Sequence, residues 1–246
     1  MIDQTLGVWA VYAAVLLVVH VVQGITGFGG IVLALPVLTL FFPIKTLIPA
    51  LILVNAAQAL YYAVAERRHI QAVHARAIIL LSLLGLPVGY ALFSYLPAEQ
   101  LKLGLGVFVV FVAVWNLSGL ELGTEPPRPL YHLLNFLGGL TQGALGSGGP
   151  FLVIYTAKMI QDKSQFRATL SLVWAVLDLL LFVFYFLNRS LTREMAPLVL
   201  VAMPVVILST WLGLVLHDRI PQKPFRTMVF AILLISGLIL LKPLVW

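Results

Sequence analysis

Apolar residues follow one another along this chain in long runs that short polar clusters separate. Runs such as Thr46–Ala65, Val73–Tyr95 and Leu101–Leu120 reach the roughly 20 residues that a membrane-spanning helix needs. Alternation of apolar and polar residues with period two, typical of strands in a membrane barrel, is absent. The pattern predicts an all-α polytopic membrane protein.

Clusters of glycine interrupt two of the apolar runs. Leu6–Val22 is followed by Gln23–Gly30, and 119 positions later this eight-residue cluster returns as Gln142–Gly149 with five residues in register. Glycine inside a helix costs about 1 kcal/mol relative to alanine. A broken helix is tolerated in a membrane where its backbone lines a cavity or is buried in protein. Matching interruptions in two halves indicate a transporter binding site.

The two halves of the chain follow the same plan. A proline-rich linker at 123–129 separates an N-terminal repeat, 1–122, from a C-terminal repeat, 130–246, which ends with an apolar run at 225–241. Gly89 and Gly213 also occupy matching places, at an offset of 124. We predict that each repeat has a glycine-broken helical hairpin followed by three transmembrane helices, and that both form a single transmembrane domain.

Basic residues indicate how the repeats are oriented. If each glycine break is the tip of a hairpin, each repeat crosses the membrane an odd number of times, and Lys and Arg divide ten to five between the two faces. If each broken element crosses once, they divide seven to eight. Because basic residues accumulate in cytoplasmic loops, the first division predicts inverted repeats in the cell (inner) membrane, with both termini on the outer face.

Composition excludes several classes of protein. A hydrophobic content of 61% with only 10% charged residues excludes a soluble globular domain. No cysteine is present, so disulfides and thiolate metal sites are excluded. No nucleophile–base pair, metal-ligand spacing or phosphate loop is present either, so we expect no enzyme activity, cofactor or metal. The net charge of +6 lies mostly in loops, where it sets topology and does not indicate nucleic acid.

The glycine breaks suit a small anion. A break frees backbone N–H groups, and a half-helix that begins after it directs its positive dipole end at the site. Thr26 and Ser147 lie in the two breaks and offer hydroxyl donors. Close packing between helices is the alternative role for these glycines.

Polar residues within the spans extend the candidate site, because they are costly in a membrane. Gln23 and Gln142 would cap freed carbonyls or donate to substrate, and Asn55 and Gln58 share a helix face. Hydrogen bonding between helices is the alternative. The candidate substrate-binding residues are Gln23, Gly24, Thr26, Gly27, Gly29, Gly30, Asn55, Gln58, Gln142, Gly143, Gly146, Ser147, Gly148, Gly149, Thr169 and Trp174, the last of which matches Asn55 in the repeat.

Asp178 is the only carboxylate deep within an apolar run, Leu170–Leu187. An isolated buried carboxylate tends to take up a proton instead of remaining charged. We therefore predict that Asp178 couples transport to protons. Pairing with an arginine or a helix N-terminus is the alternative.

These motifs resemble those of the TauE/SafE family of anion permeases over the whole chain. The family's Gly-x-Gly-Gly-Gly motif, with its following proline, is similar to Gly27-Phe28-Gly29-Gly30-Ile31 with Pro36. The second copy is similar at Gly146-Ser147-Gly148-Gly149-Pro150, and Arg167-Ala168-Thr169 is also family-like. The resemblance implies transport of sulfite, sulfonates or related sulfur-containing anions.

Three functions are consistent with these features. The first is a secondary transporter of a small sulfur-containing anion in the lipid bilayer, with protons as a possible coupling ion. The second is an anion channel on the same inverted repeats. A membrane scaffold is the third, but it would leave the duplicated glycine breaks unexplained.

Overall fold

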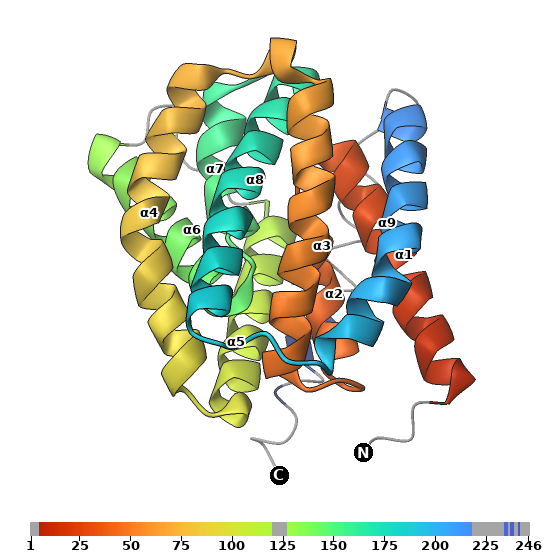
Figure 1. The fold of residues 1–246 in the computed structure, drawn as a ribbon. Helices are drawn as coiled ribbons and strands as arrows, with labels where there is room; N and C mark the ends of the chain where they lie inside the picture. The colour runs from red at the N-terminus through yellow and green to blue at the C-terminus, as the bar shows by residue number, and fades with distance from the viewer. Residues whose placement is uncertain (1–4, 120–126, 218–233, 236, 239–240, 242–246) are drawn as a thin grey trace.

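The computed structural model describes residues 5–119 and 127–217, together with positions 234, 235, 237, 238 and 241 (Figure 1). All regular elements in this part of the chain are helical. They are α1 (Leu6–Thr26), α2 (Gly30–Leu38), α3 (Ile44–Ala65), the 3-10 turn η1 (Arg67–His69), α4 (Ala72–Tyr95), α5 (Ala98–Leu117), α6 (Arg128–Leu145), α7 (Gly149–Met159), α8 (Lys163–Leu187) and α9 (Met195–His217).

Six helices within the described residues are long and apolar enough to cross a membrane. They are α1, α3, α4, α8 and α9, with residues Ala98–Trp115 of α5. Their outward faces carry large apolar side chains: Leu84 of α4 is 64% exposed and Leu200 of α9 is 74% exposed. Such exposure suits lipid and would be costly over so large an area in water. The predicted all-α multi-pass membrane protein is confirmed.

The predicted element boundaries agree closely with the structure where it can be compared. The first helix continues through the predicted break to Thr26, and α6 begins at Arg128, within the predicted linker. The rest of that linker lies largely outside the described residues, as does most of the predicted last span, 225–241.

Two long helices, α3 and α8, pack against each other at the centre of the molecule (Figure 1). On one side α1 packs along α9, which also contacts α3. On the other side α6 packs along α4, which also contacts α8. The helix on each side of a glycine break also packs on its partner, α1 on α2 and α6 on α7.

Glycines allow the two outer helix pairs to approach closely. A Cβ added to Gly24 of α1 would lie 2.9 Å from the Cα of Gly213 on α9. In the other pair, a Cβ added to Gly143 of α6 would lie 2.2 Å from the carbonyl oxygen of Leu86, and one added to Gly89 of α4 would lie 2.0 Å from that of Leu140. These distances leave no room for a side chain, so both crossings require glycine.

The helices connect two opposite faces of the molecule, called here the upper and lower faces as in Figure 1. At the upper face, the backbone N–H of Gln71 donates to Thr169 Oγ1 at 3.0 Å, which joins the starts of α4 and α8. At the lower face, Lys45 Nζ donates to the carbonyl of Ser94 at 3.3 Å, which joins the start of α3 to the end of α4. The α1–α2 hairpin therefore enters from the lower face, and the α6–α7 hairpin from the upper face (Figure 1).

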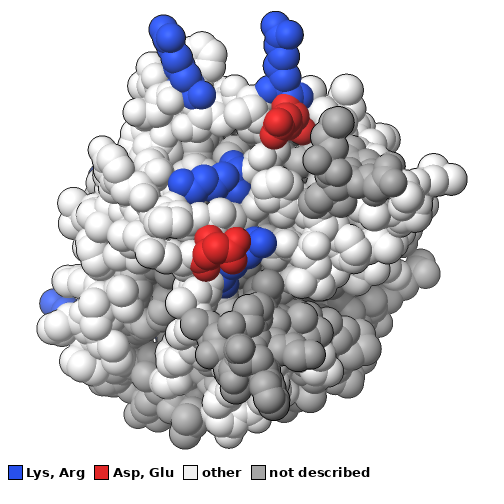
Figure 2. Space-filling view, turned by 90° about the horizontal axis from the view of Figure 1, so that it is seen from below, with Lys and Arg blue, Asp and Glu red and all other residues white. Residues whose placement is uncertain are grey.

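Among the described residues, Lys and Arg are more numerous at the upper face. Seven of the described Lys and Arg residues lie in the helix ends and connections of that face: Arg67, Arg68, Arg76, Arg128, Lys158, Lys163 and Arg167. Four lie at the lower face: Lys45, Lys102, Arg189 and Arg193. Figure 2 shows the lower face, where few of the described residues carry a charged side chain.

Candidate substrate pocket

The first glycine break is a short turn between α1 and α2. Gly27 ends α1 in the left-handed conformation, at φ 83°, and its N–H donates to the carbonyl of Gln23. Gly29 precedes α2 at φ 105°, a conformation that L side chains rarely adopt. The glycines thus let the chain reverse within three residues, and the first turn of α2 begins at the break.

The second break has the same outline with a different backbone. Gly146 ends α6 at φ 64°, and its N–H donates to the carbonyl of Gln142 at 2.8 Å. Gly148 then precedes α7 at φ −72°, so it does not share the left-handed conformation of Gly29. Pro150 in the first turn of α7 has no N–H, so this helix start has one donor fewer than α2.

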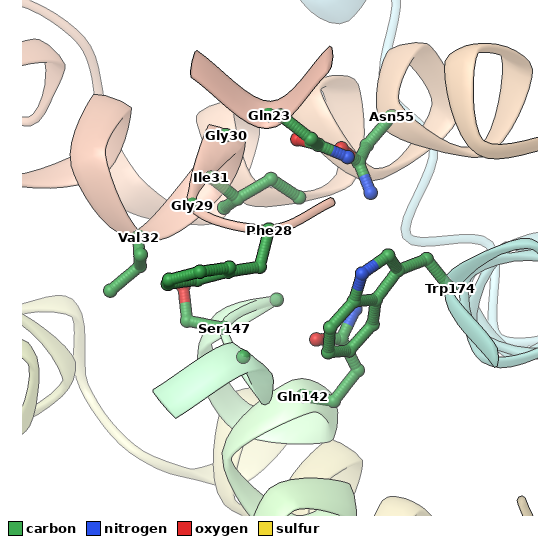
Figure 3. Close-up of a pocket in the computed structure, with 12 residues that line it drawn as sticks. Gln23, Phe28, Gly29, Gly30, Ile31, Val32, Asn55, Gln142, Ser147 and Trp174 are labelled. Atoms are coloured by element: carbon green, nitrogen blue, oxygen red, sulfur yellow. The ribbon is translucent and has the colours of Figure 1, made fainter. Parts of the chain in front are cut away.

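The two breaks meet at one small pocket. Gln23 and Asn55 approach it from one side, whereas Gln142, Ser147 and Trp174 approach from the other, with Phe28 between them (Figure 3). The lining residues are Gln23, Phe28, Gly29, Gly30, Ile31, Val32, Asn55, Gln142, Gly146, Ser147, Gly149 and Trp174. None of these carries a charge.

Asp178 lies behind the pocket, fully buried, and links three helices. Its Oδ2 accepts a hydrogen bond from Asn55 Nδ2 of α3 at 2.6 Å, and its Oδ1 accepts one from Gln142 Nε2 of α6 at 2.5 Å. Gln142 Oε1 in turn accepts from the backbone N–H of Gly148 at 2.7 Å. The carboxylate therefore orients two amides of the pocket wall and, through Gln142, the second break.

Trp174 joins α8 to the first break. Its indole Nε1 donates to the carbonyl oxygen of Gly27 at 2.9 Å. In the predicted repeat it corresponds to Asn55, and both side chains line the pocket. α3 and α8 thus each contribute one side chain to the wall, with different chemistry.

Two polar groups of the wall have no hydrogen-bond partner among the described residues. They are Asn55 Oδ1 and Ser147 Oγ, in side chains that are 5% and 3% exposed. A buried polar atom without a partner is costly. Their position in the pocket indicates a ligand that can bond to them.

Seven of the predicted site residues lie outside the pocket wall. Gly24 and Gly143 form the helix crossings described above, and Gln58 Nε2 donates to Thr210 Oγ1 at 3.1 Å. Thr26 Oγ1 lies 2.8 Å from the carbonyl oxygens of both Val22 and Phe28, one of which accepts its proton. The others are Gly27, Gly148 and Thr169, whose backbone or hydroxyl bonds hold the breaks and the upper connections.

Three apolar lining residues were not among the candidates: Phe28, Ile31 and Val32. Their position within or directly after the first glycine cluster is the one signal that identifies them. Apolar side chains there exclude water, which strengthens hydrogen bonds made inside the pocket.

A buried ion pair lies between the pocket and the upper face. Arg167 of α8 pairs with Glu66 at the end of α3, and its Nη1 donates to the carbonyl of Gly24 at 2.8 Å. Its guanidinium also lies 5.5 Å from the ring centre of Tyr62. Arg167 thus ties the end of α1 to α3 and α8.

Within the described residues, no group of three His, Asp or Glu side chains is placed to hold a metal ion. A polytopic helical membrane protein with two broken hairpins around one polar pocket has the architecture of a membrane transporter. The chain belongs to the sulfite exporter TauE/SafE family, whose model matches residues 12–240.

A curated relative supports the same assignment. The chain is 26% identical over 236 residues to a probable sulfite/organosulfonate exporter TauE of Cupriavidus necator. The aligned region covers 90% of this chain and 89% of the relative. No solved structure matches the chain significantly. The predicted family and the predicted multi-pass membrane location are confirmed.

Proposed function

We propose that this protein is a secondary transporter of a small sulfur-containing anion, such as sulfite or an organosulfonate, and that the pocket holds this anion. The main support is the convergence of two helix N-termini, those of α2 and α7, on a buried pocket with no acidic residue in its wall. First-turn N–H groups have no partner within their own helix, and the helix dipole adds positive potential there. Together they favour an anion.

The size and donors of the pocket support a small oxyanion. The pocket has about 20 Å³ in which the centre of a water-sized sphere can lie, so its free space suits a group of only a few atoms. Sulfite and the sulfonate group present several acceptor oxygens, which suit the N–H groups of α2 and the hydroxyl of Ser147. The relative from Cupriavidus necator, named a probable sulfite/organosulfonate exporter, supports the same class of substrate.

Inverted repeats are part of this proposal. The helices of the two predicted repeats correspond as α1 to α6, α2 to α7, α3 to α8 and α4 to α9. Contacts between helices follow this correspondence, because α1 packs on α9 as α6 packs on α4, and α3 contacts α9 as α8 contacts α4. The central pair α3–α8 is converted into itself, while α3 runs upward and α8 downward (Figure 1). A two-fold axis in the membrane plane would produce these relations.

The basic upper face is expected to be cytoplasmic, because Lys and Arg accumulate on that side. We predict that single cysteines placed at Arg68 and Lys163 are labelled by an impermeant maleimide from the cytoplasmic side, and one at Lys102 from the outside. The absence of cysteine from the chain gives a clean background. Labelling of Arg68 and Lys163 positions from opposite sides would contradict the inverted arrangement.

Proton coupling through Asp178 is also proposed. The carboxyl is fully buried, and both hydrogen bonds that hold it come from neutral amides. A neutral carboxylic acid can lie beside a bound anion, whereas a carboxylate would repel it. Protonation on one side of the membrane would then favour binding, and deprotonation on the other side would favour release.

Flux into proteoliposomes tests the proposal. We expect uptake of radiolabelled sulfite to saturate, to show counterflow and to increase with an imposed pH gradient. An anion channel, the alternative on the same repeats, would give large conductance in planar bilayers and no counterflow. Liposomes without protein and liposomes with the Gly149→Leu variant provide the baselines. A channel-like result would contradict the proposal of a secondary transporter but not the proposal that the pocket binds an anion.

A further inference from the structure

The ionised form of Asp178 fixes the orientation of two amides. A carboxylate only accepts hydrogen bonds, so Asn55 and Gln142 must both present their NH₂ groups to it. In this arrangement Asn55 Nδ2 lies 2.6 Å from Asp178 Oδ2. The carbonyl oxygens of the two amides must therefore point away from Asp178.

The two carbonyl oxygens differ in what they meet. Gln142 Oε1 accepts from the backbone N–H of Gly148 at 2.7 Å, so rotation of this amide would break a second bond. Asn55 Oδ1 has no hydrogen-bond partner among the described residues. Of the two amides, the one of Asn55 is thus free to rotate.

The unpartnered oxygen of Asn55 lies on the pocket side. A Cβ built on Gly30, a lining residue at the start of α2, would lie 3.4 Å from Asn55 Oδ1. The side chain is 95% buried, being 5% exposed, so water in the surroundings does not replace a partner. With Asp178 ionised, the pocket wall therefore presents an acceptor at a place where an anion needs a donor.

Protonation of Asp178 reverses this arrangement. A proton on Oδ2 would face the NH₂ group of Asn55, so two donors would meet. Rotation of the Asn55 amide by about 180° about its terminal bond removes this conflict, and such terminal torsions have two roughly equivalent orientations. After the rotation, Asn55 Oδ1 accepts the hydrogen bond from the protonated Oδ2 of Asp178, and Asn55 Nδ2 points into the pocket. Gln142 continues to donate to Oδ1 of Asp178.

We propose that Asn55 is the switch that couples protonation of Asp178 to anion binding. Its amide presents a donor to the pocket when Asp178 is protonated and an acceptor when Asp178 is ionised. The inference rests on the proposed anion-transport function and names the group that carries its coupling. It gives the two amides bonded to Asp178 different roles, since Gln142 holds the second break and Asn55 responds to the proton.

Other titratable groups surround this cluster at greater separation along the helices. Tyr185 lies seven residues further along α8, where it interacts electrostatically with Asp178 and with Tyr90 of α4. His20 of α1 is bonded to Gln58 of α3 at 2.7 Å. The Arg167–Glu66 pair lies eleven residues before Asp178 on α8, about 16 Å along a helix. Gln142 of α6 and Asn55 of α3 are the groups bonded to the carboxyl itself.

The test measures how the affinity for methanesulfonate depends on pH in purified protein. This probe remains a monoanion over the pH range used, so its own titration does not contribute. In the wild type we expect affinity to fall about tenfold from mildly acidic to mildly alkaline pH, the effect of one hydrogen bond to a charged group. In Asn55→Val and Asn55→Ala we expect a change of less than about twofold, with affinity near that of the ionised wild type. The remaining change is direct repulsion by the Asp178 carboxylate, which is weak because Asp178 does not line the pocket.

Gln58→Val is the matched control. Gln58 is one turn from Asn55 on α3, equally an amide and 2% exposed, but it bonds to His20 and Thr210 outside the pocket wall. We expect this variant to retain the full pH dependence. If Gln58→Val loses it while Asn55→Val keeps it, the coupling runs through His20 and the proposal is wrong.

Other outcomes also decide the matter. A tenfold pH dependence that persists in both Asn55 variants would mean that the charge of Asp178 acts directly, which overturns the switch. Loss of binding at every pH in these variants would overturn it too, because ionised wild type binds without a donor from Asn55. A wild type that binds without any pH dependence would refute the switch alone. A wild type that neither binds nor transports sulfonates or sulfite would refute the proposed function as well.

Discussion

Replacing Gly149 with leucine is expected to lower anion flux in proteoliposomes by about 5- to 150-fold, because forcing a side chain into occupied space costs about 1–3 kcal/mol. Gly149 lines the pocket at the first residue of α7. A side chain there would occupy the space between the two breaks in which an anion would lie. The variant should nevertheless insert and purify as a folded protein.

Gly149 is the suitable glycine because its surroundings accept a side chain. A Cβ added to it would meet Phe28 at 3.8 Å, an ordinary van der Waals distance. The neighbouring glycines are different: Gly29 has φ 105°, and a Cβ on Gly148 would lie 2.4 Å from the carbonyl oxygen of Gly138. Substitutions at those two positions would strain the backbone, so their effects on flux could not be separated from effects on folding.

Gly104→Leu is the control for adding the same side chain. Gly104 lies on α5, and an added Cβ there would meet no atom of the described residues within 4 Å. We expect Gly104→Leu to transport like the wild type and Gly149→Ala to fall between the wild type and Gly149→Leu. Flux, elution on size exclusion and thermal unfolding are measured on all three. Normal flux through folded Gly149→Leu would exclude this pocket as the anion site.

The sequence predicted the helical breaks well because glycine in an apolar run has few explanations. Each of the clusters Gln23–Gly30 and Gln142–Gly149 contains a break, and α2 and α7 begin at the last glycine of each, Gly30 and Gly149. Helix boundaries elsewhere followed from prolines and charged clusters, such as Pro43 before α3 and Glu66 after it. Local composition was sufficient for these features because each depends on a few neighbouring residues.

The role of each glycine was less predictable. Gly24 and Gly30 belong to one cluster, yet Gly24 packs on Gly213 of α9 and Gly30 faces the pocket. Which face of α1 packs on another helix depends on the tertiary arrangement, and the spacing of residues along the chain cannot predict it. Packing and binding were alternative roles for these glycines in the sequence; Gly24 has the packing role, whereas Gly30 lines the pocket proposed to bind the anion.

The partners of the buried charged residues were also beyond the sequence. Asp178 is bonded by Asn55, which is 123 residues away, and by Gln142, which is 36 residues away. Arg167 pairs with Glu66 across 101 residues. Such contacts form only when α3, α6 and α8 pack together, so periodicity along one helix cannot indicate them.

Asp178→Asn is expected to abolish accumulation driven by a pH gradient while preserving anion binding. In the wild type, coupling of one proton to one anion would allow about tenfold accumulation per pH unit of gradient, since one unit is worth about 1.4 kcal/mol. Asparagine has nearly the same volume and keeps both hydrogen bonds: its Oδ1 accepts from Gln142, and its Nδ2 donates to the rotated amide of Asn55. The variant thus imitates the protonated form permanently.

Asp162→Asn supplies the matched control, because it removes the same charge from the same helix far from the pocket. Asp162 Oδ1 caps α8 by accepting from the N–H of Gln165 at 2.8 Å, and asparagine caps a helix equally well. With the membrane potential clamped, Asp162→Asn should accumulate anion like the wild type, whereas Asp178→Asn should only equilibrate it, with an affinity independent of pH. Gradient-driven accumulation by Asp178→Asn would show that the proton is carried elsewhere, and Asp178 would then be a structural anchor for the two amides.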